Sequence, residues 1–174
     1  MRSTALAKLS VGVVVERRRA KSIWAEYLWR PVCVFAGEAA AEPWTTLDAQ
    51  AEAALFYVGQ ADIELHRTET SYYRDNLTSA APKLWVALRP SASDPPYELL
   101  AVTVDPAEGE ALTDAGSNLV ETVPMPRDIA QAVGQFIARH HVERPFIKRQ
   151  RQPAEAALTK PSPNLRRAGQ GAET

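Results

Sequence analysis

The sequence contains a single cysteine, Cys33, among its 174 residues. One thiol cannot form an internal disulfide, a CxxC redox pair, a cysteine-based zinc site or an iron–sulfur cluster, because each of these needs several thiolates. A cysteine outside such chemistry behaves as a small apolar side chain. We therefore expect Cys33 to be buried.

The chain also lacks an overall excess of charge. It has 20 Lys+Arg against 21 Asp+Glu and 45% hydrophobic residues, which is the composition of an ordinary globular protein. The charges are unevenly placed, since residues 1–138 hold 12 basic and 18 acidic residues and residues 139–174 hold 8 and 3. The sequence thus predicts an acidic body followed by a basic C-terminal tail.

Long hydrophobic runs are missing as well. The apolar stretch at residues 9–15 is followed directly by Glu16 and three arginines, without the small residues of a signal-peptide cleavage site. No window approaches the roughly 18 apolar residues needed to cross a bilayer. We expect a cytoplasmic protein with no membrane partner.

Catalytic sequence motifs are absent. The chain has no GxxxxGKS/T phosphate loop, no GxGxxG after a strand, no GxSxG elbow and no HExxH pair. A metal site assembled from His66, Glu69, Glu64 and the His140–His141 pair is possible in principle, but strand and helix-end histidines more often serve the fold. Same-face strand carboxylates such as Asp62 are usually solvated rather than catalytic. The sequence therefore predicts no catalytic residue, metal or cofactor.

Apolar periodicity predicts strands joined by turns, with helices after them. Alternating or β-branched segments predict strands at residues 11–15, 27–35, 55–58, 62–66, 83–89 and 97–104, with a hairpin turn at 59–61. Three helices are expected: one capped by Thr68 that uses Tyr73, Leu77 and Ala80, one opened by Asp105 and Pro106, and one starting at Pro126 with a stripe of Ile129, Val133, Phe136, Ile137 and His140. Residues 39–54 give only a weak signal for a helical turn or a loose connection.

These elements predict an α+β fold with a mainly antiparallel sheet and about three helices. We expect a single domain at residues 1–152 and a disordered basic tail at 153–174, because the tail carries prolines and glycines and no apolar period. Residues 144–151 interleave Phe146 with four cations, so nucleic-acid binding through the tail stays an alternative.

Three ordered blocks carry a family resemblance. They are GVVVERR (12–18) with WRPV (29–32), then LHRTET (65–70) with YRDNL (73–77), then VPMP (123–126) leading to HHVERPFIKR (140–149). Over about residues 10–151 the chain resembles an uncharacterised bacterial family of short cytoplasmic proteins encoded beside formate dehydrogenase subunits and their maturation factors.

The resemblance implies a non-enzymatic accessory or assembly protein in the maturation of a molybdenum-dependent formate dehydrogenase. The expected partner is a protein, either a subunit of that enzyme or a maturation factor. An alternative is a binding protein or enzyme for an anionic, pterin- or nucleotide-like small molecule, held by the block His66-Arg67-Glu69-Arg74. The expected partner- or ligand-binding residues are His66, Arg67, Glu69, Tyr73, Arg74, Asn76, Trp29 and Arg30.

Overall fold

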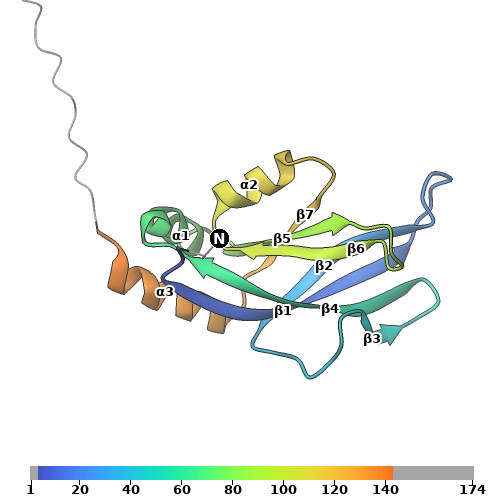
Figure 1. Cartoon of the computed structure of the whole chain (residues 1–174), viewed down its shortest axis with the longest axis horizontal. Coiled ribbons are helices and arrows are strands. Elements are labelled where there is room, and N and C mark those ends of the chain that lie inside the picture. The colour runs from blue at the N-terminus through green and yellow to red at the C-terminus, as the bar shows by residue number, and fades with distance from the viewer. Residues whose placement is uncertain (1–3, 143–174) are drawn as a thin grey trace, which may run out of the picture. The chain divides into compact units, whose positions relative to one another are not determined.

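The computed structural model describes residues 4–142. Within this range the chain forms two antiparallel sheets and three α-helices (Figure 1), which confirms the predicted α+β class. The elements in chain order are β1 (Ala7–Arg19), β2 (Tyr27–Ala36), β3 (Thr45–Ala49), β4 (Ala53–Leu65), a 3-10 turn (Arg67–Glu69), α1 (Thr70–Leu77), β5 (Lys83–Pro90), β6 (Tyr97–Thr103), α2 (Pro106–Asp114), β7 (Leu119–Pro124) and α3 (Arg127–His140).

The first sheet has the strand order β2-β1-β4-β3. Its centre is the pair β1 and β4, both 13 residues long, which run antiparallel from Ala7 opposite Leu65 to Arg18 opposite Ala53. β2 pairs with the other side of β1 and is an edge strand of this sheet. The ladder shifts register near Pro31, as expected for a residue that has no backbone N–H to donate.

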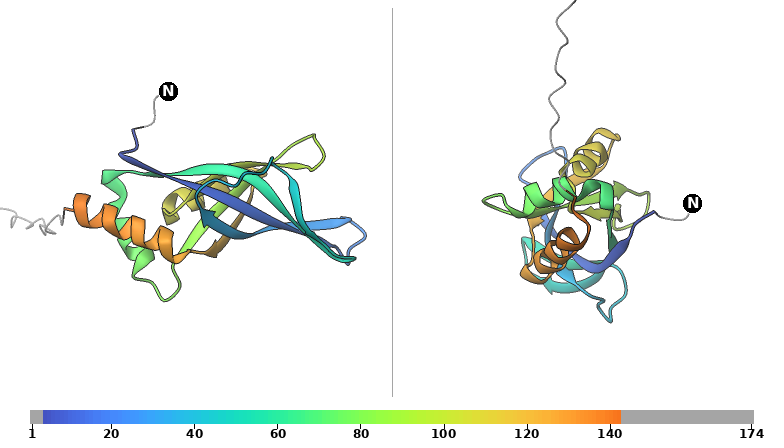
Figure 2. Two further views of the ribbon diagram at one scale, coloured as in Figure 1. Left: turned by 90° about the horizontal axis from the view of Figure 1, so that it is seen from below. Right: turned by 90° about the vertical axis from the view of Figure 1, so that its left-hand side faces the viewer.

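The second sheet has the order β6-β5-β7 and faces the first across the hydrophobic core. Strands of the two sheets also meet at both sides, because β4 contacts β6 and β2 contacts β7 (Figures 1 and 2). The core is continuous, and its members come from both sheets, α1 and α3. Its largest fully buried side chains are Tyr73, Ile63, Leu65, Leu84, Leu88 and Ile129.

The helices cover different parts of this sandwich. α3 contributes the buried residues Ile129, Val133 and Phe136, which confirms the predicted apolar stripe, and it also contacts α1. α2 lies against β5, so the second sheet is covered on both faces. Asp105 caps α2 as predicted, since its carboxylate accepts a hydrogen bond from the Ala107 backbone N–H at 2.9 Å.

The predicted hairpin turn at 59–61 is wrong. β4 continues through this region as one strand, and Gly59 adopts a φ of +130° where the ladder with β1 shifts register. A glycine can take this backbone conformation without a Cβ clash, so it signals a bulge here and not a chain reversal.

Several local predictions are also corrected. The weak segment 39–54 contains β3 and a turn into β4, and β7 forms where no strand was predicted. α1 ends at Leu77, so Ala80 lies outside it and is exposed. Thr68 does not cap α1, because its hydroxyl donates to Glu69 Oε1 instead. Cys33 is exposed, since its side chain points away from the core on the edge strand β2.

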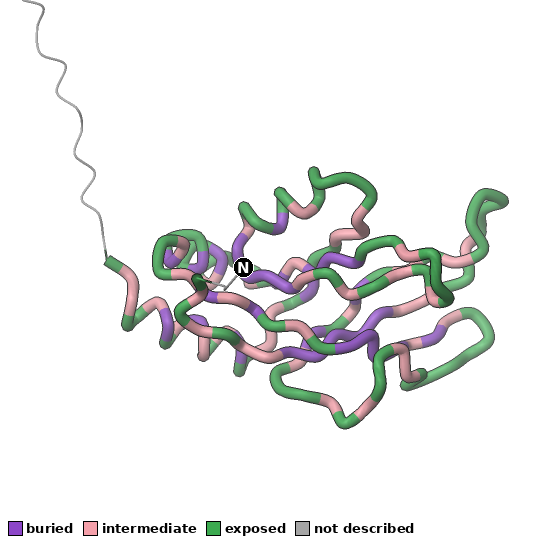
Figure 3. The backbone as a smooth tube through the Cα atoms, in the orientation of Figure 1, coloured by how far each residue is buried: buried purple, intermediate pink, exposed green. Residues whose placement is uncertain are grey.

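Figure 3 shows burial along the backbone: the buried residues lie mainly in the strands and on the inner sides of the helices, the turns are mostly exposed, and β3 has no buried residue. No helix in the described range is long and apolar enough to span a membrane. The predicted tail, the expected boundary at residue 152 and the basic segment 144–151 lie outside the described residues.

Candidate functional site

The eight residues predicted from the sequence fall into two separate regions. His66, Arg67, Glu69, Tyr73, Arg74 and Asn76 follow the end of β4, where Leu65 pairs with the start of β1. Trp29 and Arg30 instead pair with Arg17 and Glu16 toward the other end of β1. The structure therefore does not assemble one site from all of them.

Tyr73 and Asn76 serve the fold. The Tyr73 hydroxyl accepts a hydrogen bond from the His66 backbone N–H at 3.0 Å, and burial raises the pKa of Tyr73 to about 12. The Asn76 amide donates to the carbonyls of Lys83 and Val104, while its oxygen accepts from the Lys83 N–H. Both side chains are almost fully buried. They fix α1 to the strands and are not available to a partner.

His66 and Glu69 are half-buried and take part in local contacts. His66 Nε2 lies 3.9 Å from Glu64 Oε2, and Glu64 also binds Lys8 Nζ at 2.8 Å. Glu69 accepts the hydroxyl hydrogen bond from Thr68. Within residues 4–142 no three His, Cys, Asp or Glu side chains are grouped so that they could hold a metal ion.

Arg74 belongs to a hydrogen-bonded chain that joins α1 to the end of α3. Its guanidinium lies 3.0 Å from His141 Nε2, and His141 Nδ1 lies 3.0 Å from the Thr70 hydroxyl. Because a guanidinium can only donate, Nε2 must accept and Nδ1 must carry the proton. The Thr70 hydroxyl in turn donates to the Arg67 carbonyl. Thr70 is a residue that the sequence reasoning missed, since a buried threonine inside a helix has no distinctive pattern.

Trp29 is part of an aromatic cluster between the sheets. Its ring lies 5.8 Å from Trp44, 5.8 Å from Phe56 and 6.2 Å from Tyr97. The Arg17 guanidinium lies over the Tyr27 ring at 4.5 Å and near Phe56 at 5.2 Å. Trp29 is therefore mainly a packing residue, and Arg17 stabilises the cluster through cation–π contacts.

Arg30 shares a carboxylate with Arg18. The two guanidiniums each lie 2.9 Å from one oxygen of Glu16, whose side chain is largely shielded from solvent. The hydrogen bond from Arg18, together with the one from Arg30, lowers the pKa of Glu16. The arginine side chains themselves remain about 60% exposed, at 59% and 62%.

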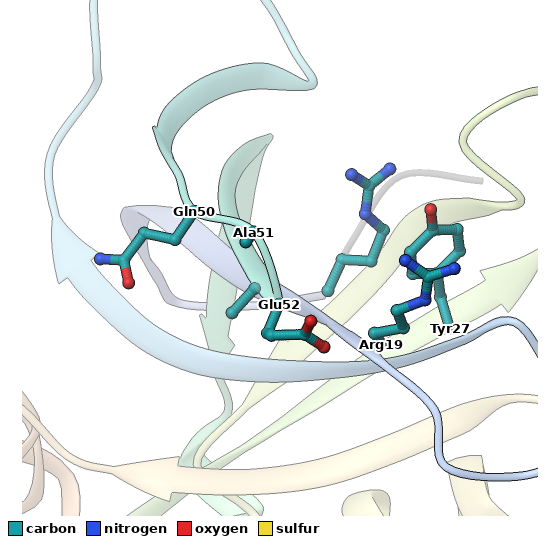
Figure 4. A pocket seen from close by; sticks show the side chains of 7 residues that line it. Arg19, Tyr27, Gln50, Ala51 and Glu52 are labelled. Carbon is teal, nitrogen blue, oxygen red and sulfur yellow. The ribbon is translucent and has the colours of Figure 1, made fainter.

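A pocket lies where the β1–β2 hairpin meets the turn between β3 and β4 (Figure 4). It is polar, and the Arg19 backbone N–H binds the Glu52 carbonyl at its edge. Its lining residues are Arg17, Arg19, Tyr27, Gln50, Ala51, Glu52 and Ala53. The sequence reasoning missed this pocket, because it did not identify the turn at 50–52 or its proximity to Arg19.

Comparison with known proteins gives one match. A family model described as a protein of unknown function, DUF3305, matches residues 10–150, which include the three blocks that carry the sequence resemblance. No curated protein and no solved structure matches the chain.

Proposed function

Because the chain belongs to the DUF3305 family, whose function is unknown, we propose that it is a non-enzymatic accessory protein that binds a protein partner. The partner we propose is a subunit or maturation factor of a molybdenum-dependent formate dehydrogenase. The choice of this partner rests on the sequence resemblance, and the binding role rests on the structure around α1.

The observation that supports binding is that some side chains around α1 are buried and hold the helix in place, while their neighbours are exposed. Tyr73 and Asn76 are buried, and their hydrogen bonds attach α1 to the neighbouring backbone. Arg67 and Tyr72 are exposed beside them, Tyr72 by 48%. A packed support that presents an arginine and a tyrosine to solvent is typical of protein recognition surfaces, where these two residue types are enriched.

Arg74 and His141 are in contact at the same end of the fold, and we group four side chains (Arg67, Tyr72, Arg74 and His141) as the helix-end surface, with Tyr72 and Arg74 on opposite flanks of the buried Tyr73. The contact between Arg74 and His141 and the bond to Thr70 tie the end of α3 to α1. The helix-end surface thus joins two of the three family-like blocks, although they are about 70 residues apart in the sequence. This convergence supports a common binding role for the two blocks.

The test measures binding of the purified chain to the candidate formate dehydrogenase subunits and maturation factors. The double variant Arg67→Ala, Tyr72→Ala should bind at least roughly tenfold more weakly, as expected for the loss of two interface anchors. Its melting temperature should match that of the parent, because both side chains are exposed. Arg127→Ala is the matched control, since Arg127 is an exposed arginine at the start of α3.

The cellular readout is formate dehydrogenase activity in a strain that carries each variant at normal abundance. Lower activity with the double variant and normal activity with Arg127→Ala would support the proposal. If the parent chain binds none of these proteins, or if the double variant supports full activity, the proposed function is wrong.

A further inference from the structure

The loop between β1 and β2 presents two large apolar side chains to solvent. Ile23 is 91% exposed and Trp24 is 89% exposed. The loop is a defined turn, since the Ala20 N–H binds the Glu26 carbonyl at 2.9 Å and the Trp24 N–H binds Ser22 Oγ at 3.1 Å. It projects beyond the neighbouring strand ends in Figures 1 and 2. We call residues 20–26 the hairpin tip.

Positive charge is concentrated next to the hairpin tip. Between Glu16 and Glu26 the chain carries four cations and no acidic residue, although residues 1–138 as a whole are acidic. Arg18, Arg19 and Lys21 are exposed, although Arg18 is paired with Glu16, whereas Arg17 is held over the Tyr27 ring. Glu26 ends the hairpin tip on the β2 side, and Glu52 lies next to Arg19, because its carbonyl accepts the Arg19 backbone N–H.

Exposed apolar residues flanked by cations suit two kinds of surface, a protein pocket or an anionic lipid headgroup layer. A stable protein interface buries about 800 Å² on each partner, which is more than two side chains at a narrow turn can supply. A bilayer requires no complementary shape, because apolar side chains enter the headgroup region individually and adjacent cations are attracted to anionic lipids. Tryptophan in particular favours this region.

We propose that the hairpin tip inserts Ile23 and Trp24 into the headgroup region of an anionic lipid bilayer, with Arg19 and Lys21 against the lipid phosphates. This mode of contact is peripheral and leaves the fold unchanged. It revises the expectation of no membrane partner, because that expectation was based on the absence of a long apolar segment that could span a bilayer. Two exposed apolar residues at a turn are too few to form such a segment.

The test is co-sedimentation of the full chain with vesicles of phosphatidylcholine alone or phosphatidylcholine mixed with phosphatidylglycerol. The parent should bind the mixed vesicles, and added salt should weaken this binding by screening. The double variant Ile23→Ser, Trp24→Ser should bind at least roughly tenfold more weakly, because it loses most of the apolar transfer free energy. The emission of the parent should shift to the blue on binding, and Trp24→Phe should bind while losing most of that shift.

Two control variants separate the hairpin tip from other sources of binding. Leu6→Ser, Leu100→Ser removes apolar side chains that are exposed elsewhere. The quadruple variant Arg144→Gln, Lys148→Gln, Arg149→Gln, Arg151→Gln removes the positive charges of the basic segment near the C-terminus. Both should bind vesicles like the parent. The proposal is overturned if the two vesicle types bind equally, if the tip variant binds like the parent, or if only the C-terminal variant loses binding. Self-association of the parent that the tip variant abolishes, without vesicle binding, would also overturn it.

Discussion

Within residues 4–142 two glycines lie inside helices, and they have very different neighbours. Gly109 in α2 lies against the Trp85 ring, and a Cβ added at position 109 would overlap the Cγ and Cδ1 atoms of that ring. Gly134 in α3 has only Leu77 nearby, and an added Cβ would lie 3.6 Å from its Cδ2 atom, an ordinary contact. Packing therefore requires glycine at position 109, whereas position 134 has room for an alanine, which would stabilise the helix.

We expect Gly109→Ala to lower the free energy of unfolding by about 1–3 kcal/mol, the usual cost of overpacking. Gly134→Ala should raise it by roughly 0.5–1 kcal/mol, because alanine favours the helix. Urea denaturation of both variants measures the two changes. Equal effects of the same sign would show that Trp85 does not pack against α2 as described.

Phe136 provides the next prediction at this scale. It is 6% exposed, and its ring lies 6.3 Å from Tyr73 and 4.6 Å from His140. Phe136→Ala should cost about 3 kcal/mol or more, because it leaves a large cavity between α3 and the core. The denaturant midpoint should fall accordingly, while Val142→Ala, at a position 63% exposed, should leave it unchanged.

Individual polar residues were harder to assign from the sequence than apolar ones. Ile63 and Leu65 are buried as their alternation predicts. Asn76 and Tyr73 were expected to bind a partner, but both bind backbone groups of the chain itself. Asn76 donates to the Val104 carbonyl, and the Tyr73 hydroxyl accepts from the His66 N–H. Periodicity reports which side of an element is apolar, and it does not report which polar side chain has a backbone partner.

At the scale of elements, the start of α2 depends on one carboxylate. Asp105 is 7% exposed, and burial raises the pKa of this group despite the hydrogen bond from the Ala107 N–H. The charges of Glu69 and Glu108 also raise it. The folded protein therefore holds the Asp105 proton more tightly than the unfolded chain, whose ordinary value is 3.8.

This shift fixes the sign of a pH effect. The destabilisation from ionising Asp105 is absent below pH 3.8 and develops as the pH rises through the raised folded pKa. Asp105→Asn should keep the cap and lose this component of the pH dependence. Asp105→Ala should cost about 1 kcal/mol at neutral pH through loss of the cap. Thermal melts of the parent and both variants across pH 3–7 measure this, and a parallel pH dependence in Asp105→Asn and the parent would contradict it.

Elements with a strong period were predicted and elements without one were missed. α3 was predicted from its stripe and α2 from its cap and proline, and both are present. β3 has an almost entirely exposed sequence, TTLDA, so no alternation marks it, and its pairing with β4 determines its conformation. The same dependence on tertiary contacts explains why the pocket beside the turn at 50–52 was not foreseen.

At the scale of the whole molecule, the described core is formed by residues between Val11 and Phe136. The sequence predicts that residues after 153 add no apolar face to it. A chain truncated after Pro153 should melt within about 4 °C of the full chain, which corresponds to about 1 kcal/mol for a domain near this size. A larger fall in melting temperature would show that this segment contributes to the folded state.

The long β1–β4 ladder has a consequence for the order of events on the ribosome. β1 can pair with β2 as soon as the first hairpin has emerged, but the other side of β1 waits for residues 53–65. Until then its run of valines and its backbone groups form an open edge on a growing chain. The pairing of Ala7 with Leu65 also makes contacts of high sequence separation central to the fold, which favours slow folding. A nascent chain stalled shortly before β4 would therefore expose an unpaired β1 edge, the kind of strand edge that promotes aggregation.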